Sequence, residues 1–257
     1  SFLRKDLPPH EPVPPSFTSA ELLDAVRNTK MQKAFPRDDC HLAVKAMCSS
    51  EFFLDILLVI FNRCLTACTF PKPLKRGTFI MLQKPGGRGL RPICLLPILA
   101  RFLDRLLHNR LIKHTPYLAS SHVRAGTQHG FTPLKSTESC NSERLLFLDQ
   151  AKKDGLSIFG LSLDIKGCFN FIWPKLLTDS LQTLPIPHYL AKFVVSYFTE
   201  RSTLQGTIIY CACPQGGVSS PDILNIVLFR IHDLLARTLQ TQTCPYGCRN
   251  FINSYTD

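Results

Sequence analysis

Two aspartates stand where carboxylates from neighbouring strands could hold a hard cation. Asp164 lies inside "IFGLSLDI", on the polar side of an alternating pattern whose other side carries Phe159, Leu161 and Leu163. Strand interiors disfavour Asp, so the position indicates a functional role. Asp257 ends "FINSYTD", a second predicted strand. Two such carboxylates could hold two Mg²⁺ ions roughly 3.5–4 Å apart for in-line phosphoryl transfer. The alternative is that the two aspartates share no metal site. In that case Asp164 is an exposed residue of an edge strand and Asp257 is a solvated residue of the chain end.

The elements that must position these aspartates indicate an α+β protein. Helical spacing of apolar residues predicts helices over 18–30, twice within 41–69, and over 97–114, 138–153, 174–184 and 187–199. A last helix should follow Ser220 and Pro221, which are good N-cap and N1 residues. Predicted strands are a hairpin with a basic tip over 77–96, the strand 158–165, a strand pair over 203–213 and a last strand from about Arg249.

Composition and charge narrow the class of protein. The chain has 257 residues and 45% apolar content, which suits one large domain or two subdomains. Its 30 basic and 19 acidic residues give a net charge of +11, which predicts a polyanionic partner such as nucleic acid; a generally basic soluble surface is the alternative.

Cysteine content and hydropathy bear on the compartment. The 11 cysteines are odd in number and many lie inside apolar runs, so they do not indicate a disulfide framework. The apolar run "EFFLDILLVIF" is too short to span a bilayer, and no signal peptide is visible. We therefore expect an intracellular protein, nuclear or cytoplasmic, without a membrane partner.

Six sequence blocks together resemble one family. "LSLDIKGCFNFI", "CPQGGVSSPDILNIVL" and "SYTD" are similar to motifs A, B and C of reverse transcriptases of non-LTR (LINE-type) retrotransposons. "LQKPGGRGLRPICLLPILARFLDRLLHNRL" resembles the fingers segment, "QHGFTPLKST" the loop that follows it, and "YFTERS" the stretch before motif B. The six blocks appear in the family's order within residues 16–257.

The resemblance implies a right-hand polymerase and assigns its parts. Residues 1–15 would be an extended Pro-rich lead-in, 16–155 the N-terminal helices and fingers, and 156–257 a partial palm whose antiparallel sheet packs on helices. The motif C block stops after its first aspartate, so we expect the chain to be a fragment that lacks the thumb and has little activity by itself. The implied partners are an RNA template, a DNA primer, their RNA–DNA hybrid and deoxynucleoside triphosphates.

The resemblance also implies the roles of single residues. Asp164 and Asp257 would be catalytic and hold two Mg²⁺ ions, for which Mn²⁺ could substitute, with the main-chain carbonyl of Ile165 as a further ligand. Phe169 matches the aromatic residue that packs under the incoming sugar and selects deoxynucleotides; a core Phe is the alternative. Gln215 matches the residue that contacts the sugar and the templating pair.

Four basic residues complete the implied site. Lys84 and Arg91 match fingers residues that grip the triphosphate, although a solvated hairpin tip would also carry such cations. Lys135 and Arg201 would touch template or primer phosphates.

Two other functions stay open at this point. An RNA-dependent RNA polymerase would carry an Asp where Phe169 stands and a Gly where Thr256 stands, which disfavours that alternative. The other is an inactive, basic, nucleic-acid-binding remnant, consistent with Asn170 in place of a third acidic residue and Asp222 in place of an apolar one.

Overall fold

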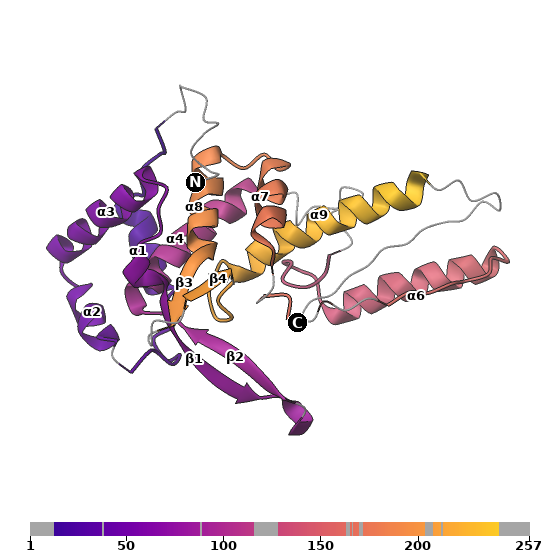
Figure 1. The fold of residues 1–257 in the computed structure, drawn as a ribbon, viewed down its shortest axis with the longest axis horizontal. Coiled ribbons are helices and arrows are strands. Elements are labelled where there is room, and N and C mark those ends of the chain that lie inside the picture. Colours follow the sequence, from indigo (N-terminus) through magenta and orange to yellow (C-terminus); the bar gives the residue numbers. More distant parts are fainter. Residues whose placement is uncertain are drawn as a thin grey trace.

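The computed structural model describes residues 13–115 and 128–241, apart from positions 38, 88, 163–164, 166, 170–171, 204–207 and 212. In this part of the chain, helices form the body and a long β-hairpin extends away from them (Figure 1). The mixture of helices with a small sheet confirms the α+β class at this coarse level.

The helices form where the apolar spacing predicts them. They are α1 (Ser19–Arg27), α2 (His41–Met47), α3 (Glu51–Thr66), α4 (Ile98–His114), α6 (Thr137–Lys153), α7 (Pro174–Gln182), α8 (His188–Phe198) and α9 (Ser220–Thr241), with the short 3₁₀ helices η1 (Lys72–Lys75) and η2 (Pro85–Gly87). Glu21 and Thr18 cap α1 reciprocally: each side chain accepts a hydrogen bond from the other's backbone N–H.

The core lies around α4 and α8, which run through the helical body. Phe102, Leu103 and Leu107 of α4 and Phe193 and Phe198 of α8 are at most 1% exposed, and side chains of α1, α3, α7 and α9 pack into the same cluster. In contrast, α6 extends away from this body (Figure 1), and Ala151 is its one buried residue. The core therefore fixes α4 and the first half of α9 firmly, and these elements flank the candidate site.

The sheet joins the hairpin to a second strand pair. Strand β1 (Arg76–Gln83) pairs antiparallel with β2 (Leu90–Leu95), and β3 (Thr199–Thr203) pairs antiparallel with β4 (Ile208–Cys211). A short parallel pairing, with Arg76 opposite Ser202 and Gly77 opposite Thr203, gives the strand order β2-β1-β3-β4. The distal half of the hairpin extends away from the helical body (Figure 1), and the β1 residues in it are exposed.

The antiparallel palm sheet expected within residues 156–257 stays a prediction, because its strand at 158–165 is described only in part and its last strand lies outside the described residues. The described sheet is mixed, and residues 158–162, predicted as part of a strand, have no strand structure; Phe159 is 91% and Leu161 74% exposed. Alternation alone does not make a strand, because the backbone needs a neighbouring edge for its hydrogen bonds. No described strand pairs with 158–162, and the last predicted strand, from Arg249, lies outside the described residues.

An ion pair between α1 and α4 should make the fold sensitive to acid. Arg110 Nε and Nη2 each donate to a Glu21 carboxylate oxygen at 2.7 Å. Burial by itself would raise the pKa of Glu21, but the hydrogen bonds from Arg110 and the Thr18 N–H and the charges of Arg110 and Lys113 lower it to about 2. A carboxylate with a depressed pKa stabilises the fold above its unfolded pKa of 4.5, and this stabilisation is lost as the pH falls toward 2.

We expect Glu21→Gln to lower the free energy of unfolding at pH 7 by about 2 kcal/mol, because it leaves the buried guanidinium half-paired. The difference from the wild type should shrink as the pH falls below 4.5. Urea unfolding at several pH values measures both. The control Asp179→Asn removes an exposed pair with Lys175 at 2.9 Å and should cost no more than about 0.5 kcal/mol. A Glu21→Gln effect that does not change with pH would contradict the role of the ion pair.

Candidate nucleotide-binding site

A cavity of about 250 Å³ brings together segments that are far apart in the sequence. Three residues that the resemblance assigned to the nucleotide line it: Arg91 from β2, Phe169 from the segment before α7, and Gln215 from the loop before α9. The rest of the lining is Ile93, Phe131, Gly216, Gly217, Ser220 and Pro221. The structure thus combines a cation, two aromatic rings and a glycine-containing loop around one cavity.

The loop from Pro214 to Ser219 lies directly against β2. Cys94 N–H donates to the Gln215 carbonyl at 2.8 Å, and Gly216 has φ +126 with space for a side chain blocked by the Cys94 carbonyl. The side-chain Oε1 of Gln215 is buried and has no hydrogen-bond partner among the described residues. An unpaired buried acceptor is costly, so the hydrogen bonding of the Gln215 side chain is incomplete in this structure.

The start of α9 differs by one residue from the sequence prediction. The helix begins at Ser220, and the first helical hydrogen bond runs from Ile223 N–H to the Ser219 carbonyl at 3.0 Å, so Ser219 is the N-cap. Ser220 does not cap the helix, because its hydroxyl donates to the Pro214 carbonyl at 2.9 Å and closes the loop. Asp222, which stands where the family has an apolar residue, pairs with His108 of α4 at 2.5 Å.

Two phenylalanines form the aromatic wall of the cavity. Phe169 is 7% exposed and belongs to the main core, and the Phe131 ring meets it edge-on at a centroid distance of 6.0 Å and an angle of 76°. The two interpretations of Phe169, core residue and cavity wall, are therefore compatible. Phe131 was given no role from the sequence, although an aromatic residue within the polar block "QHGFTPLKST" was a signal for one.

The segment that carries Phe131 is tied to two helices. Asn225 of α9 accepts a hydrogen bond from Gln128 Nε2 at 3.3 Å and donates to the Gly130 carbonyl at 3.3 Å. His129 is buried, with its ring nitrogens 2.7 Å from the Ser139 hydroxyl and 3.0 Å from a Glu143 carboxylate oxygen of α6. These contacts hold the backbone on either side of Phe131 in place.

The other predicted basic residues lie outside the cavity lining. Lys84 is exposed beside the hairpin turn, where its N–H donates to the Gly89 carbonyl at 2.9 Å. Lys135 has its Nζ 3.8 Å from Glu143 Oε1. Arg201 is 4% exposed, donates to the Tyr197 carbonyl at 2.8 Å and stacks on the Tyr197 ring, so its placement does not support contact with template or primer phosphates.

The predicted metal ligands cannot be compared with the structure as a set. Asp164 and Asp257 lie outside the described residues, whereas Ile165 is described and 48% exposed. Among the side chains that the structure describes, no three His, Cys, Asp or Glu residues gather as metal ligands. The paired-carboxylate hypothesis therefore stays a prediction.

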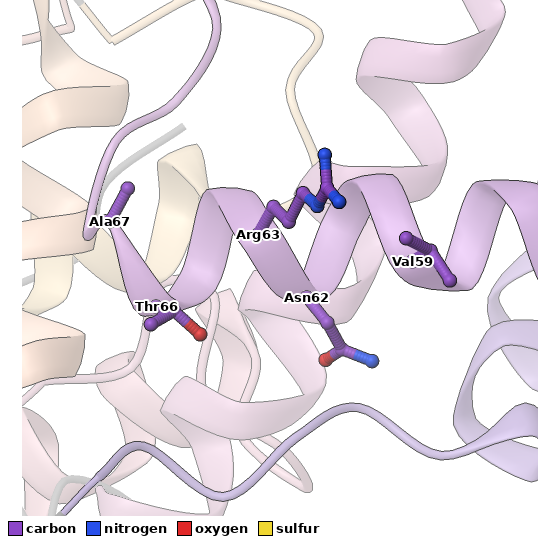
Figure 2. Close-up of a pocket in the computed structure, with 5 residues that line it drawn as sticks. All are labelled: Val59, Asn62, Arg63, Thr66 and Ala67. Atoms are coloured by element: carbon purple, nitrogen blue, oxygen red, sulfur yellow. The ribbon is translucent and has the colours of Figure 1, made fainter.

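A larger hollow, about 480 Å³, lies along the end of α3. Figure 2 shows that its labelled side chains, Val59, Asn62, Arg63, Thr66 and Ala67, all belong to α3 or to the residue that follows it. Since no described side chain from a second element lines this hollow, the smaller cavity is the better candidate for a functional site.

The fold and the cavity define a mixed α/β protein with a pocket lined by an arginine, two aromatic rings and a glycine-containing loop. The family model described as "Reverse transcriptase (RNA-dependent DNA polymerase)" matches residues 82–257, more than half of the chain. The chain therefore belongs to the reverse transcriptase family, and its resemblance to the non-LTR retrotransposon type is confirmed by the relatives below.

Curated relatives come from mobile elements of insects. The chain is 30% identical over 191 residues to the RNA-directed DNA polymerase from mobile element jockey of Drosophila melanogaster, covering 67% of this chain and 20% of the relative. It is 25% identical over 236 residues to a retrovirus-related Pol polyprotein from the type-1 retrotransposable element R1 of Bradysia coprophila, covering 84% and 22%. The chain thus spans about a fifth of the length of these relatives.

In the described residues, no helix is long and apolar enough to cross a membrane.

Proposed function

We propose that this chain is the polymerase part of a non-LTR retroelement protein and takes part in RNA-directed DNA synthesis. Its ligands would be an RNA template, a DNA primer and deoxynucleoside triphosphates, in a nuclear or cytoplasmic setting. The observation that carries the proposal is the cavity where Arg91, Phe169 and Gln215 meet in a member of the reverse transcriptase family. In this proposal, residues 16–155 supply the fingers and 156–257 part of the palm.

Each residue of the cavity has a distinct task in this proposal. Arg91 would bind the triphosphate, the Phe169 ring would lie under the sugar, and the Gln215 Oε1 would accept a hydrogen bond from the nucleotide. Asp164, Asp257 and the Ile165 carbonyl would hold divalent metal, Mg²⁺ or its substitute Mn²⁺. When bound, such ions supply activation of the primer 3′-hydroxyl and neutralisation of the triphosphate charge. Lys84 and Lys135 would contact phosphates from outside the cavity.

Primer extension on an RNA template tests the proposal directly. Because the chain spans about a fifth of its relatives' length, the test uses a full-length protein, meaning this chain within a protein of the relatives' length. It should extend a DNA primer on poly(rA) with dTTP, and EDTA should stop the reaction. The net charge of +11 also predicts hybrid binding that weakens steeply between about 50 and 200 mM salt, because phosphate contacts release counterions. Salt-sensitive hybrid binding without any extension would favour the inactive remnant instead. Hybrid binding that does not change with salt concentration would contradict both the polymerase and the inactive remnant.

The aromatic wall predicts how the site distinguishes sugars. Phe169→Val should raise the relative use of ribonucleotides about a hundredfold, because the flat ring that leaves no room for a 2′-hydroxyl is replaced by a smaller side chain. Competing dTTP and UTP in primer extension measures the ratio. Phe193→Leu alters a fully buried core ring outside the cavity lining and should change stability but not the ratio. An unchanged ratio in Phe169→Val would show that this ring does not select the sugar.

A further inference from the structure

A fully buried carboxylate of α4 holds the loop that carries Gln215. Asp104 is 0% exposed, and its Oδ2 accepts from Val218 N–H at 2.6 Å while its Oδ1 accepts from Ser219 N–H at 3.2 Å. The Ser219 hydroxyl also donates to Oδ1. All three donors belong to the loop between the cavity and α9. The carboxylate therefore makes these hydrogen bonds to a single segment.

The buried surroundings of Asp104 make the loss of these hydrogen bonds costly in free energy. Burial raises the pKa of its carboxyl, whereas the hydrogen bonds from Ser219 and Val218 and the charge of the buried Arg201 act against that rise. A buried carboxylate is tolerated only when its oxygens are hydrogen-bonded, and here both are. Removing either the charge or the acceptors would therefore release the loop backbone.

The loop is held at both ends, and two of the cavity residues, Gly216 and Gly217, lie between these attachments. At one end, β2 binds the Gln215 carbonyl through Cys94 N–H at 2.8 Å, and the Ser220 hydroxyl binds the Pro214 carbonyl at 2.9 Å. At the other end, Asp104 binds Val218 and Ser219. Gly216 and Gly217, which offer little resistance to backbone rotation, lie between the two ends.

We propose that Asp104 is a positioning residue of the nucleotide cavity: by fixing Val218 and Ser219 it sets the place of Gln215 and so the affinity for the incoming nucleotide. The inference rests on the proposed function. It identifies a residue on the fingers side, 111 positions before Gln215 in the chain, that does not line the cavity.

The alternative is that Asp104 only stabilises the start of α9 and has no effect on the cavity. The chain offers a matched control for this alternative. His108, one turn after Asp104 on α4, pairs with Asp222 in the first turn of α9 at 2.5 Å. This pair also joins α4 to α9, but among the described residues neither side chain makes a hydrogen bond or ion pair with the 214–219 loop. His108→Ala should therefore lower thermal stability and leave the nucleotide KM unchanged.

The experiment is steady-state primer extension on poly(rA) with varied dTTP, using the full-length protein and its Asp104→Asn, Ser219→Ala, Gln215→Ala and His108→Ala variants. In Asp104→Asn either orientation of the amide turns its NH₂ toward a backbone N–H, so we expect KM for dTTP to rise about tenfold or more with kcat much less affected. Ser219→Ala removes one of the three donors and should raise KM about twofold to threefold; it also serves if Asp104→Asn does not fold.

A double-mutant cycle distinguishes positioning from a general loss of stability. If Asp104 acts through Gln215, the Asp104→Asn/Gln215→Ala double variant should have the KM of Gln215→Ala alone. Additive effects, or a normal KM in both Asp104→Asn and Ser219→Ala, would overturn the inference while leaving the proposed function intact. A wild-type protein that extends no primer would overturn both.

Discussion

Replacing Asp164 with alanine should lower RNA-templated primer extension by about a thousandfold. Removing one group that stabilises developing charge in an active site lowers the rate on the order of a hundred- to a thousandfold. We expect the loss of Asp164 to lower the rate by at least as much. In the proposed site Asp164 contributes a full negative charge from the palm, and two carboxylates are needed where divalent ions bind between strands. Losing one would leave Asp257 and a carbonyl, a poor ligand set for a hard cation.

The measurement needs binding and activity from the same samples. Asp164→Ala should still bind an RNA–DNA hybrid, because affinity for the hybrid depends on basic side chains that contact phosphates and not on this carboxylate. Asp149→Asn provides the control: it removes an exposed carboxylate that pairs with Lys153 on α6 at 2.7 Å, and it should leave extension unchanged. Full activity in Asp164→Ala would reject the paired-carboxylate mechanism, and loss of both activity and binding would indicate misfolding.

Local features of the fold were predictable from the sequence because their causes are local. The α1 capping box follows from Thr18 and Glu21 three residues apart, and the hairpin follows from apolar runs around "KPGGRG". The lack of strand structure at 158–162 was not predictable, because alternation describes one face of a strand and says nothing about which edge will pair with it. Arg201 was assigned to template or primer phosphates through the resemblance, yet it is buried and lies over the Tyr197 ring.

The candidate site was predictable in part for the same reason. Arg91, Phe169 and Gln215 were found through family motifs, and the structure brings these three to one cavity. Asp104 was missed because its partners, Val218 and Ser219, lie 114 and 115 positions further along the chain. An Asp within an otherwise amphipathic helix resembles any solvated residue until the loop that covers it is known.

Gly216 should be a position in the loop where an added methyl group is poorly tolerated. Its φ of +126 lies in a region that L-residues rarely adopt, and an added Cβ would lie 2.8 Å from the Cys94 carbonyl oxygen, a backbone atom that cannot rotate away. The loop would have to leave β2, which breaks the Cys94–Gln215 hydrogen bond and moves the Gln215 side chain out of the cavity.

We therefore expect Gly216→Ala to lower kcat/KM for dTTP about a hundredfold, as displacements of about 1 Å at a reacting site can do. Unfolding free energy should fall by roughly 2–3 kcal/mol, because backbone strain and a steric clash add together. Gly155→Ala is the matched control, with φ +67 and nothing within 4 Å of the added Cβ. It should cost about 1 kcal/mol of stability from strain alone and leave dTTP kinetics unchanged. If Gly216→Ala behaved like Gly155→Ala in both measurements, close contact between the loop and β2 would not be what holds Gln215 in the cavity.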